Sequence, residues 1–67
     1  MTKKDKKVKC RYWCHHYEAD YAVEDEVNSV TNNLQEEGYN IIDVVIDYIR
    51  FSVEECQYVF AVTILYE

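Results

Sequence analysis

Residues 41–67 read IIDVVIDYIRFSVEECQYVFAVTILYE, and this stretch decides the fold. Two runs rich in Val, Ile, Phe and Tyr flank a short polar break, Glu54-Glu55-Cys56-Gln57, which is a pattern typical of a β-hairpin. The break lacks an Asn-Gly or Asp-Gly pair, so we expect a four-residue connection. The second run is apolar on both faces, with Tyr58, Phe60, Val62, Ile64 and Tyr66 on one face and Val59, Ala61 and Leu65 on the other.

Both faces of this hairpin therefore need cover, although the chain is short. Its 67 residues make one domain, and a chain of this size buries only roughly 60% of its unfolded surface. Three cysteines cannot all pair within one chain, and no apolar segment follows the basic N-terminus as in a signal peptide. We expect an intracellular, reduced protein without disulfides, for which oligomerisation supplies the missing stability.

Charge is divided unevenly along the chain. Residues 1–11 hold six basic residues and one acid, a net charge of +5, whereas residues 12–67 hold twelve acids and Arg50 alone, a net charge of −11. An acidic body repels the phosphates of nucleic acid, so direct nucleic-acid binding is not expected and a basic protein surface is the expected partner. Plain solubility is the alternative explanation of this acidity. No run reaches the roughly 18 apolar residues of a membrane span, so no membrane partner is expected.

The segments before the hairpin predict a basic lead, a strand and a helix. Residues 1–7 are a polar, Lys-rich lead that we expect to be flexible, and residues 8–67 form the single domain. Residues 8–17 alternate as a strand does, and its even side, with Val8, Cys10, Tyr12 and Cys14, is the expected core side. On the odd side Trp13 is either a half-covered surface residue or an interface anchor.

Residues 20–37 predict the one helix. Its apolar stripe consists of Val23, Val27, Val30 and Leu34. Asp20 is the expected N-cap and Gly38 the expected stop after the last turn.

The order strand, helix, strand, strand predicts an α+β fold of the β-α-β-β type, with one amphipathic helix on one face of a three-stranded sheet. One helix can cover one face. The other face would expose some of the side chains Val45, Ile49, Phe51, Val59, Ala61 and Leu65, and an apolar patch of that kind usually marks an interaction site. We therefore expect a homodimer that forms through the sheet, either face to face or edge to edge.

Three short motifs resemble a known family. The segments Glu26-Val27-Asn28, Ile46-Asp47-Tyr48-Ile49-Arg50-Phe51-Ser52 and Ile64-Leu65-Tyr66 are similar to those of the short "controlled by sigma-E" sporulation proteins and related small phage proteins. The resemblance covers most of residues 8–67, although the Cys- and His-containing first strand and the Lys-rich lead depart from it. It implies a small non-enzymatic protein of a bacterial cytoplasm, or of the host cytoplasm for a phage protein. It carries over no catalytic residue.

The cysteines and histidines of the first strand suggest a metal site, but their spacing does not suit one. Cys10 and Cys14 lie roughly 13 Å apart on an extended strand, too far for one tetrahedral ion. A bend at His15 and His16, or ligands from a second copy, would be needed, and Cys56 could join from the hairpin turn. Structural or incidental cysteines remain the favoured reading, so we expect no cofactor.

An enzyme is not expected. A nucleophilic Cys–His pair would need a cleft and an oxyanion hole, for which a chain with one glycine and two layers has little room. The acids Glu24, Asp25 and Glu26 occupy adjacent helix positions, so they fan outward and do not converge as a catalytic pair would.

These patterns favour a small acidic protein that binds and inhibits or regulates a host protein, for example a defence enzyme. Its candidate contact residues are the helix acids and the aromatic side chains at the ends of the elements: Glu24, Asp25, Glu26, Trp13, Tyr17, Tyr21 and Tyr39. One alternative is a protein that sequesters a nucleotide-type small molecule through His15, His16 and Arg50. The other is a structural protein of sporulation.

Overall fold

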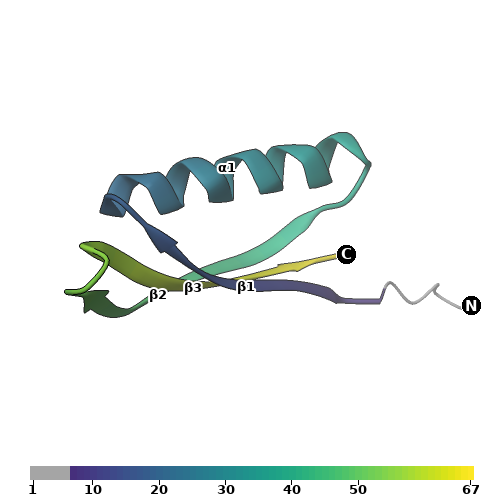
Figure 1. The fold of residues 1–67 in the computed structure, drawn as a ribbon. Coiled ribbons are helices and arrows are strands. Elements are labelled where there is room, and N and C mark those ends of the chain that lie inside the picture. The colour runs from purple at the N-terminus through teal and green to yellow at the C-terminus, as the bar shows by residue number, and fades with distance from the viewer. Residues whose placement is uncertain (1–6) are drawn as a thin grey trace, which may run out of the picture.

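The computed structural model describes residues 7–67, which form one helix packed across a three-stranded sheet (Figure 1). The elements follow in the order β1 (Lys9–Tyr17), α1 (Asp20–Glu36), β2 (Ile41–Ser52) and β3 (Gln57–Tyr66). This is the α+β fold of the β-α-β-β type that the sequence predicts. Residues 1–6 of the predicted basic lead lie outside the described residues.

The sheet has the strand order β1-β3-β2, and β3 pairs antiparallel with both of its neighbours. The predicted hairpin is thus confirmed as β2 and β3, joined by the four residues 53–56. Cys56 ends this turn in the left-handed region, with a φ of 54°. The connection through α1 carries the chain from one edge of the sheet to the other, so β1 and β2 are both edge strands.

The core lies between α1 and one face of the sheet, which we call the helix face. The predicted stripe is confirmed, because Val23, Val27 and Leu34 are buried and Val30 is half-buried. The central strand β3 contributes the most deeply buried side chains, and both Val62 and Ile64 have an exposed fraction of 0%. The alternation of β3 is also confirmed, with its even-numbered residues on the helix face and its odd-numbered residues on the opposite, open face.

The two ends of α1 are stabilised differently. The N-cap is Ala19 and no side chain caps it, so the prediction that Asp20 is the N-cap is wrong; Asp20 is the first helical residue instead. At the other end Gly38 has a φ of 99°, as predicted for the residue after the C-cap. The N–H groups of Gly38 and Tyr39 donate to the carbonyls of Gln35 and Leu34, which is a Schellman motif. Within the described residues no helix is both long and apolar enough to cross a membrane.

The predicted core side of β1 is wrong. Trp13 and Tyr17, on the odd-numbered side, pack against the core, and Tyr12 on the even side is 62% exposed. Trp13 lies opposite Val62 on β3, and directly opposite residues of an antiparallel pair project to the same face. The physical reason is size, because burying two large aromatic side chains removes far more apolar area from water than burying two cysteines.

Two irregularities change the faces of β2. The pairing with β3 skips Ile42 and Ile49, which are therefore bulged. Beyond the second bulge, Phe51 lies opposite Tyr58 on the helix face, so the prediction that it lies on the uncovered face is wrong. Val45, Val59, Ala61 and Leu65 do lie on the open face, away from the helix, as predicted. Of these four, Val45 alone is exposed, at 40%, because Val59 and Ala61 are buried within the sheet and Leu65 is half-buried.

The helix does not cover the whole of its own face of the sheet, contrary to expectation. On β2, Ile46 is 37% exposed, Tyr48 57% and Phe51 40%, although all three point to the helix side. An α-helix with its side chains is roughly 10–12 Å wide and strands are roughly 4.8 Å apart, so one helix shields about two strands. In this fold the second half of β2, from Ile46 onward, is left uncovered, whereas Ile41 and Val44 in its first half pack against the core.

Two valines at opposite extremes of burial test this packing. Val62→Ala should lower the free energy of unfolding by about 2 kcal/mol, because it removes two buried carbon groups and leaves a cavity. Val53→Ala, at a turn position that is 79% exposed, is the matched control and should change it by less than about 0.5 kcal/mol. Urea denaturation of the two variants measures both values, and equal effects would contradict the described core.

Candidate functional site

The three acids at the start of α1 point in different directions, as adjacent helical residues must. Glu24 lines a groove toward β2, and Asp25 is exposed to solvent. Glu26 faces β1, where it is only partly exposed and accepts a hydrogen bond from Tyr17. The predicted contact surface therefore holds Glu24 and Asp25, while Glu26 belongs to the packing between α1 and β1.

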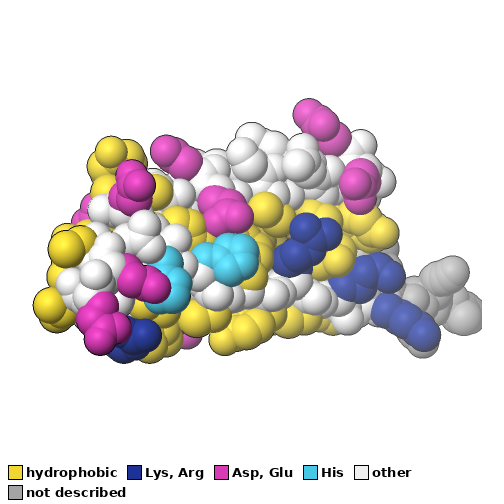
Figure 2. Space-filling model, viewed as in Figure 1, with side chains coloured by type: hydrophobic (Ala, Val, Ile, Leu, Met, Phe, Trp, Pro, Cys, Tyr) yellow, Lys and Arg dark blue, Asp and Glu magenta, His cyan; other side chains and the backbone are white. Residues whose placement is uncertain are grey.

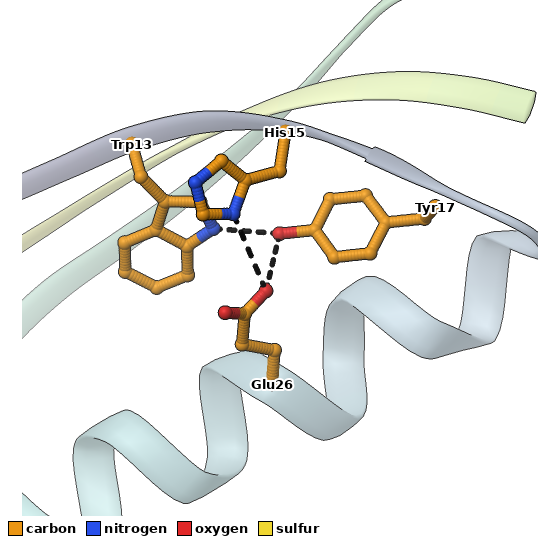
Figure 3. Close-up of polar contacts among 4 residues, drawn as sticks. All are labelled: Trp13, His15, Tyr17 and Glu26. Carbon is orange, nitrogen blue, oxygen red and sulfur yellow. Dashed lines mark hydrogen bonds and ion pairs between the residues drawn. The ribbon is translucent and has the colours of Figure 1, made fainter.

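Glu26 is the centre of a polar cluster that joins α1 to β1 (Figure 3). The indole N–H of Trp13 donates to the Tyr17 hydroxyl oxygen at 2.6 Å, and that hydroxyl donates to Oε1 of Glu26 at 2.6 Å. Nδ1 of His15 lies 4.0 Å from the same carboxylate oxygen. Tyr17 and His15 of β1 thus contact one carboxylate of the helix, and Trp13 is linked to it through the Tyr17 hydroxyl. Sequence reasoning missed this cluster because Tyr17 and His15 lie nine or more residues from Glu26.

Tyr17 keeps its proton in this cluster. Burial is the largest of the causes that raise the pKa of its hydroxyl to about 12, and the hydrogen bond to Glu26 and the negative charge of that carboxylate contribute to the same shift. Donation from the Trp13 indole opposes the shift. A phenol with this pKa neither acts as a base nor ionises at neutral pH, so the cluster can hold β1 and α1 together but offers no activated nucleophile.

The histidines and cysteines do not gather. His15 lies on the helix face and His16 on the open face, because adjacent strand residues project to opposite sides. Cys10 and Cys14 lie on the open face in separate rows, opposite Leu65 and Ala61. Within residues 7–67, no three His, Cys, Asp or Glu side chains come close enough to hold a metal ion together.

The proposed ligand-binding residues are likewise apart. His16 and Arg50 lie on opposite edges of the open face, with Val59 of β3 between them, since both are paired with that residue. Nε2 of His16 instead contacts Oε1 of Glu55 at 3.2 Å. The structure therefore does not bring His15, His16 and Arg50 into one pocket within a single chain.

Of the three tyrosines predicted to make contacts, one is free to do so. Tyr21, in the first turn of α1, is 67% exposed, whereas Tyr17 is buried in the core. Tyr39 packs edge-on against Tyr66, with their ring centroids 5.0 Å apart, and the Lys9 ammonium lies 5.9 Å from its ring centroid. Tyr21 is thus the aromatic side chain best placed to meet a partner.

A groove runs between α1 and β2 where the helix leaves the strand uncovered. It consists of two cavities of about 450 and 500 Å³, which share Glu24 and Ile46. The first is also lined by Val27, Asn28, Thr31, Gln35, Ile41 and Val44, and the second by Asp20, Tyr21, Val23 and Phe60. The sequence signal for this groove was the high density of Ile, Val, Tyr and Phe in β2.

Six exposed acids lie where α1 begins and in the adjacent turn between β2 and β3 (Figures 1 and 2). We call this region the acidic end; it consists of Glu18, Asp20, Glu24, Asp25, Glu54 and Glu55, all of them exposed. Lys7, Lys9 and Arg11 lie at the other end of the molecule, along the start of β1 (Figure 2). The uneven charge of the sequence thus becomes a partial separation of charge in space, since Glu36 and Glu37 are exposed where α1 ends and Arg50 lies near the end of β2 that leads to the acidic end.

The chain matches no family model, no curated protein and no solved structure. The resemblance to the "controlled by sigma-E" family therefore stays a prediction from the three motifs.

The raised pKa of Tyr17 predicts how stability depends on pH. The unfolded tyrosine loses its proton near pH 10 and the folded one near pH 12, so the stability that Tyr17 contributes is complete below pH 10 and is lost as the pH rises toward 12. Tyr17→Phe should remove this part of the decline in the free energy of unfolding. At neutral pH the variant should be less stable by about 1–2 kcal/mol, because Glu26 and the Trp13 indole lose the hydroxyl that they contact.

Denaturation of the wild type and of this variant at pH 8 and pH 11 measures the difference. Tyr21→Phe is the control, because the exposed Tyr21 hydroxyl has no such partner among the described hydrogen bonds. If Tyr17→Phe and the wild type lose equal stability between the two pH values, the assigned role of Tyr17 is contradicted.

Proposed function

We propose that this chain is a small non-enzymatic binding protein whose acidic end attaches to a basic surface of another protein and thereby inhibits or regulates it. One observation carries the proposal: the exposed acids are not neutralised within the described residues. The ion pairs there are those of His15 with Glu26 and of His16 with Glu55, and no Lys or Arg takes part. Unpaired carboxylates at one end are available to a basic partner.

The acidic end combines charge with an aromatic side chain. Five of its acids lie outside any described ion pair, and Tyr21 stands exposed among them at the start of α1. Clustered charge of one sign raises the rate of encounter with an oppositely charged surface, over roughly 10 Å at 0.1 M salt. An exposed tyrosine then supplies apolar contact area at small entropic cost.

The same charge argues against nucleotides and nucleic acids as ligands. The ionisable residues that line the groove are Asp20 and Glu24, so phosphate groups would be repelled there. A host protein in the bacterial cytoplasm, such as a defence enzyme with a basic working surface, is the partner class that we propose.

Charge reversal at the acidic end tests the proposal. Asp25→Lys combined with Glu54→Lys changes two exposed acids that line neither cavity and form no described ion pair. A partner captured from bacterial lysate by the wild type should bind this variant at least tenfold more weakly, which corresponds to about 1.4 kcal/mol. Titration of the purified partner at low and at high salt measures the affinity.

The matched control is Glu36→Lys combined with Glu37→Lys, which makes the same change in net charge at the opposite end of α1. It should leave the affinity within about threefold, as expected when two charges lie beyond a Debye length from the contact. Unchanged binding by the acidic-end variant, or a larger loss in the control, would contradict the proposed surface.

A further inference from the structure

The outer edge of β2 differs from that of β1. Six large apolar side chains of β2 remain 37–57% exposed, namely Ile42, Val45, Ile46, Tyr48, Ile49 and Phe51. On β1, Tyr12 is the one exposed large apolar side chain. An edge strand presents unpaired N–H and C=O groups, and a long apolar edge is a template for pairing with another strand.

We propose that β2 pairs antiparallel with β2 of a second copy of this chain, about a two-fold axis at Ile46. The two three-stranded sheets then join into one sheet of six strands, with both helices on the same face. The groove between α1 and β2 lies along this seam, and its shared residue Ile46 lies on the axis. The inference goes beyond the proposed function, because it concerns a second copy of this chain and not the basic protein that we propose as the partner of the acidic end.

The faces of β2 limit which pairings are possible. Ile41, Val44, Ile46, Tyr48 and Phe51 point to the helix face, and Asp43, Val45, Asp47, Arg50 and Ser52 point to the open face. Residues that lie directly opposite in an antiparallel pair project to the same face. A two-fold pairing that keeps every side chain on its own face must therefore be centred on a residue.

The charges of β2 exclude some of these registers, and the length of the pairing favours one of the others. If the bulged Ile42 and Ile49 are left out of the count and Ile46 lies on the axis, Arg50 lies opposite Asp43 of the partner subunit, and the symmetry forms this ion pair twice. Centring the pairing on Tyr48 would also pair Arg50 with an acid, the partner's Asp47, but it would join only residues 45–52. Centring the pairing on Asp47 would instead place two aspartates directly opposite each other, and centring it on Val45 would place Asp43 opposite the partner's Asp47. Opposite charges stabilise a cross-strand pair and like charges destabilise it.

The apolar residues fit the same register. On the helix face Ile46 meets the partner's Ile46, Val44 meets the partner's Tyr48, and Ile41 meets the partner's Phe51. The two bulges of β2, at Ile42 and Ile49, lie on either side of Ile46. Each half of the seam therefore contains one bulge from each strand, one on each side of the pair of Arg50 and Asp43, and the two strands are in step again where Ile41 meets Phe51. The register spans residues 41–51, almost the whole strand.

Charge also argues against pairing β2 with β1 of another copy. Asp43 and Asp47 point to the open face, whereas the basic residues Lys9 and Arg11 of β1 point to the helix face. They would not meet across such a seam. That arrangement would also repeat without closing, whereas the two-fold pairing uses the same surface of both copies and closes as a dimer.

Charge exchange across the seam tests the register. Arg50→Asp should weaken dimerisation at least tenfold, because it places two acids opposite each other, and Asp43→Arg should do the same. The double variant Asp43→Arg/Arg50→Asp restores both ion pairs in reversed order and should return the dimer to within about threefold of the wild type. Sedimentation equilibrium of the full chain, in reducing buffer over a range of concentrations, measures each constant.

The matched control is Asp47→Arg/Arg50→Asp, which exchanges the same charges in the register centred on Tyr48, where Arg50 would meet the partner's Asp47. It should not restore the dimer. A wild type that stays monomeric at every concentration, a double exchange at Asp43 that fails to restore the dimer, or restoration by the Asp47 exchange would each overturn the proposal.

A cysteine at the axis gives a readout that does not depend on charge. In a chain whose Cys10, Cys14 and Cys56 are replaced by serine, Ile46→Cys should form a disulfide dimer under mild oxidation, because opposite Cα atoms lie about 4.5–5.5 Å apart. Tyr48→Cys, two residues from the axis, should cross-link at least tenfold more slowly. Faster cross-linking of Tyr48→Cys would overturn the register.

Discussion

The structure depends on the packing of one narrow helix against a sheet that is wider than the helix. The stripe of Val23, Val27, Val30 and Leu34 is the apolar surface that α1 offers to the sheet, and Val62 and Ile64 of β3 lie completely buried beneath it. A single helix shields about two strands. Part of a third strand then remains exposed to solvent on the helix face as well as on the open face. The surfaces that remain available for binding depend on which strand this is.

The polar cluster at Glu26 helps to decide which strand the helix leaves exposed. Because Tyr17 donates to Glu26 and accepts from Trp13, α1 is held against β1, and the second half of β2 at the other edge is left uncovered. Partly buried hydrogen bonds of this kind are costly to break, since each lost partner leaves a polar group with reduced access to water. The cluster therefore helps to fix the position of α1 on the sheet and also contributes to the stability of the fold. The acidic end stays outside it, so its carboxylates remain available.

Much of the fold was predictable from local patterns. The helical stripe and the alternation of β3 follow from periodicity, because one period fits each of them along its whole length. The hairpin follows from its two apolar runs and the polar break between them. The core side of β1 was not predictable in this way, since the small cysteines match the pattern better than Trp13 and Tyr17, and their burial depends on Glu26 nine or more residues away. The face of Phe51 was missed because a bulge at Ile49 shifts the alternation by one residue.

The strand order, on which the two exposed edges depend, is a property of the whole chain. As for the candidate site, the sequence showed the acidic charge of residues 12–67. It did not show that several of these acids lie together at one end of the molecule, or that Glu26 packs against β1 and so is not part of that surface.

The central claim is that the uncovered strand β2 is completed by a second copy. Amide hydrogen exchange followed by NMR addresses this directly, because in an edge strand every second N–H points away from the sheet. We expect the outward N–H groups of β2 to be protected at high protein concentration and to lose this protection on dilution, while the outward N–H groups of β1 exchange quickly throughout. If the outward amides of β2 exchange as fast as those of β1 at every concentration, the claim is wrong.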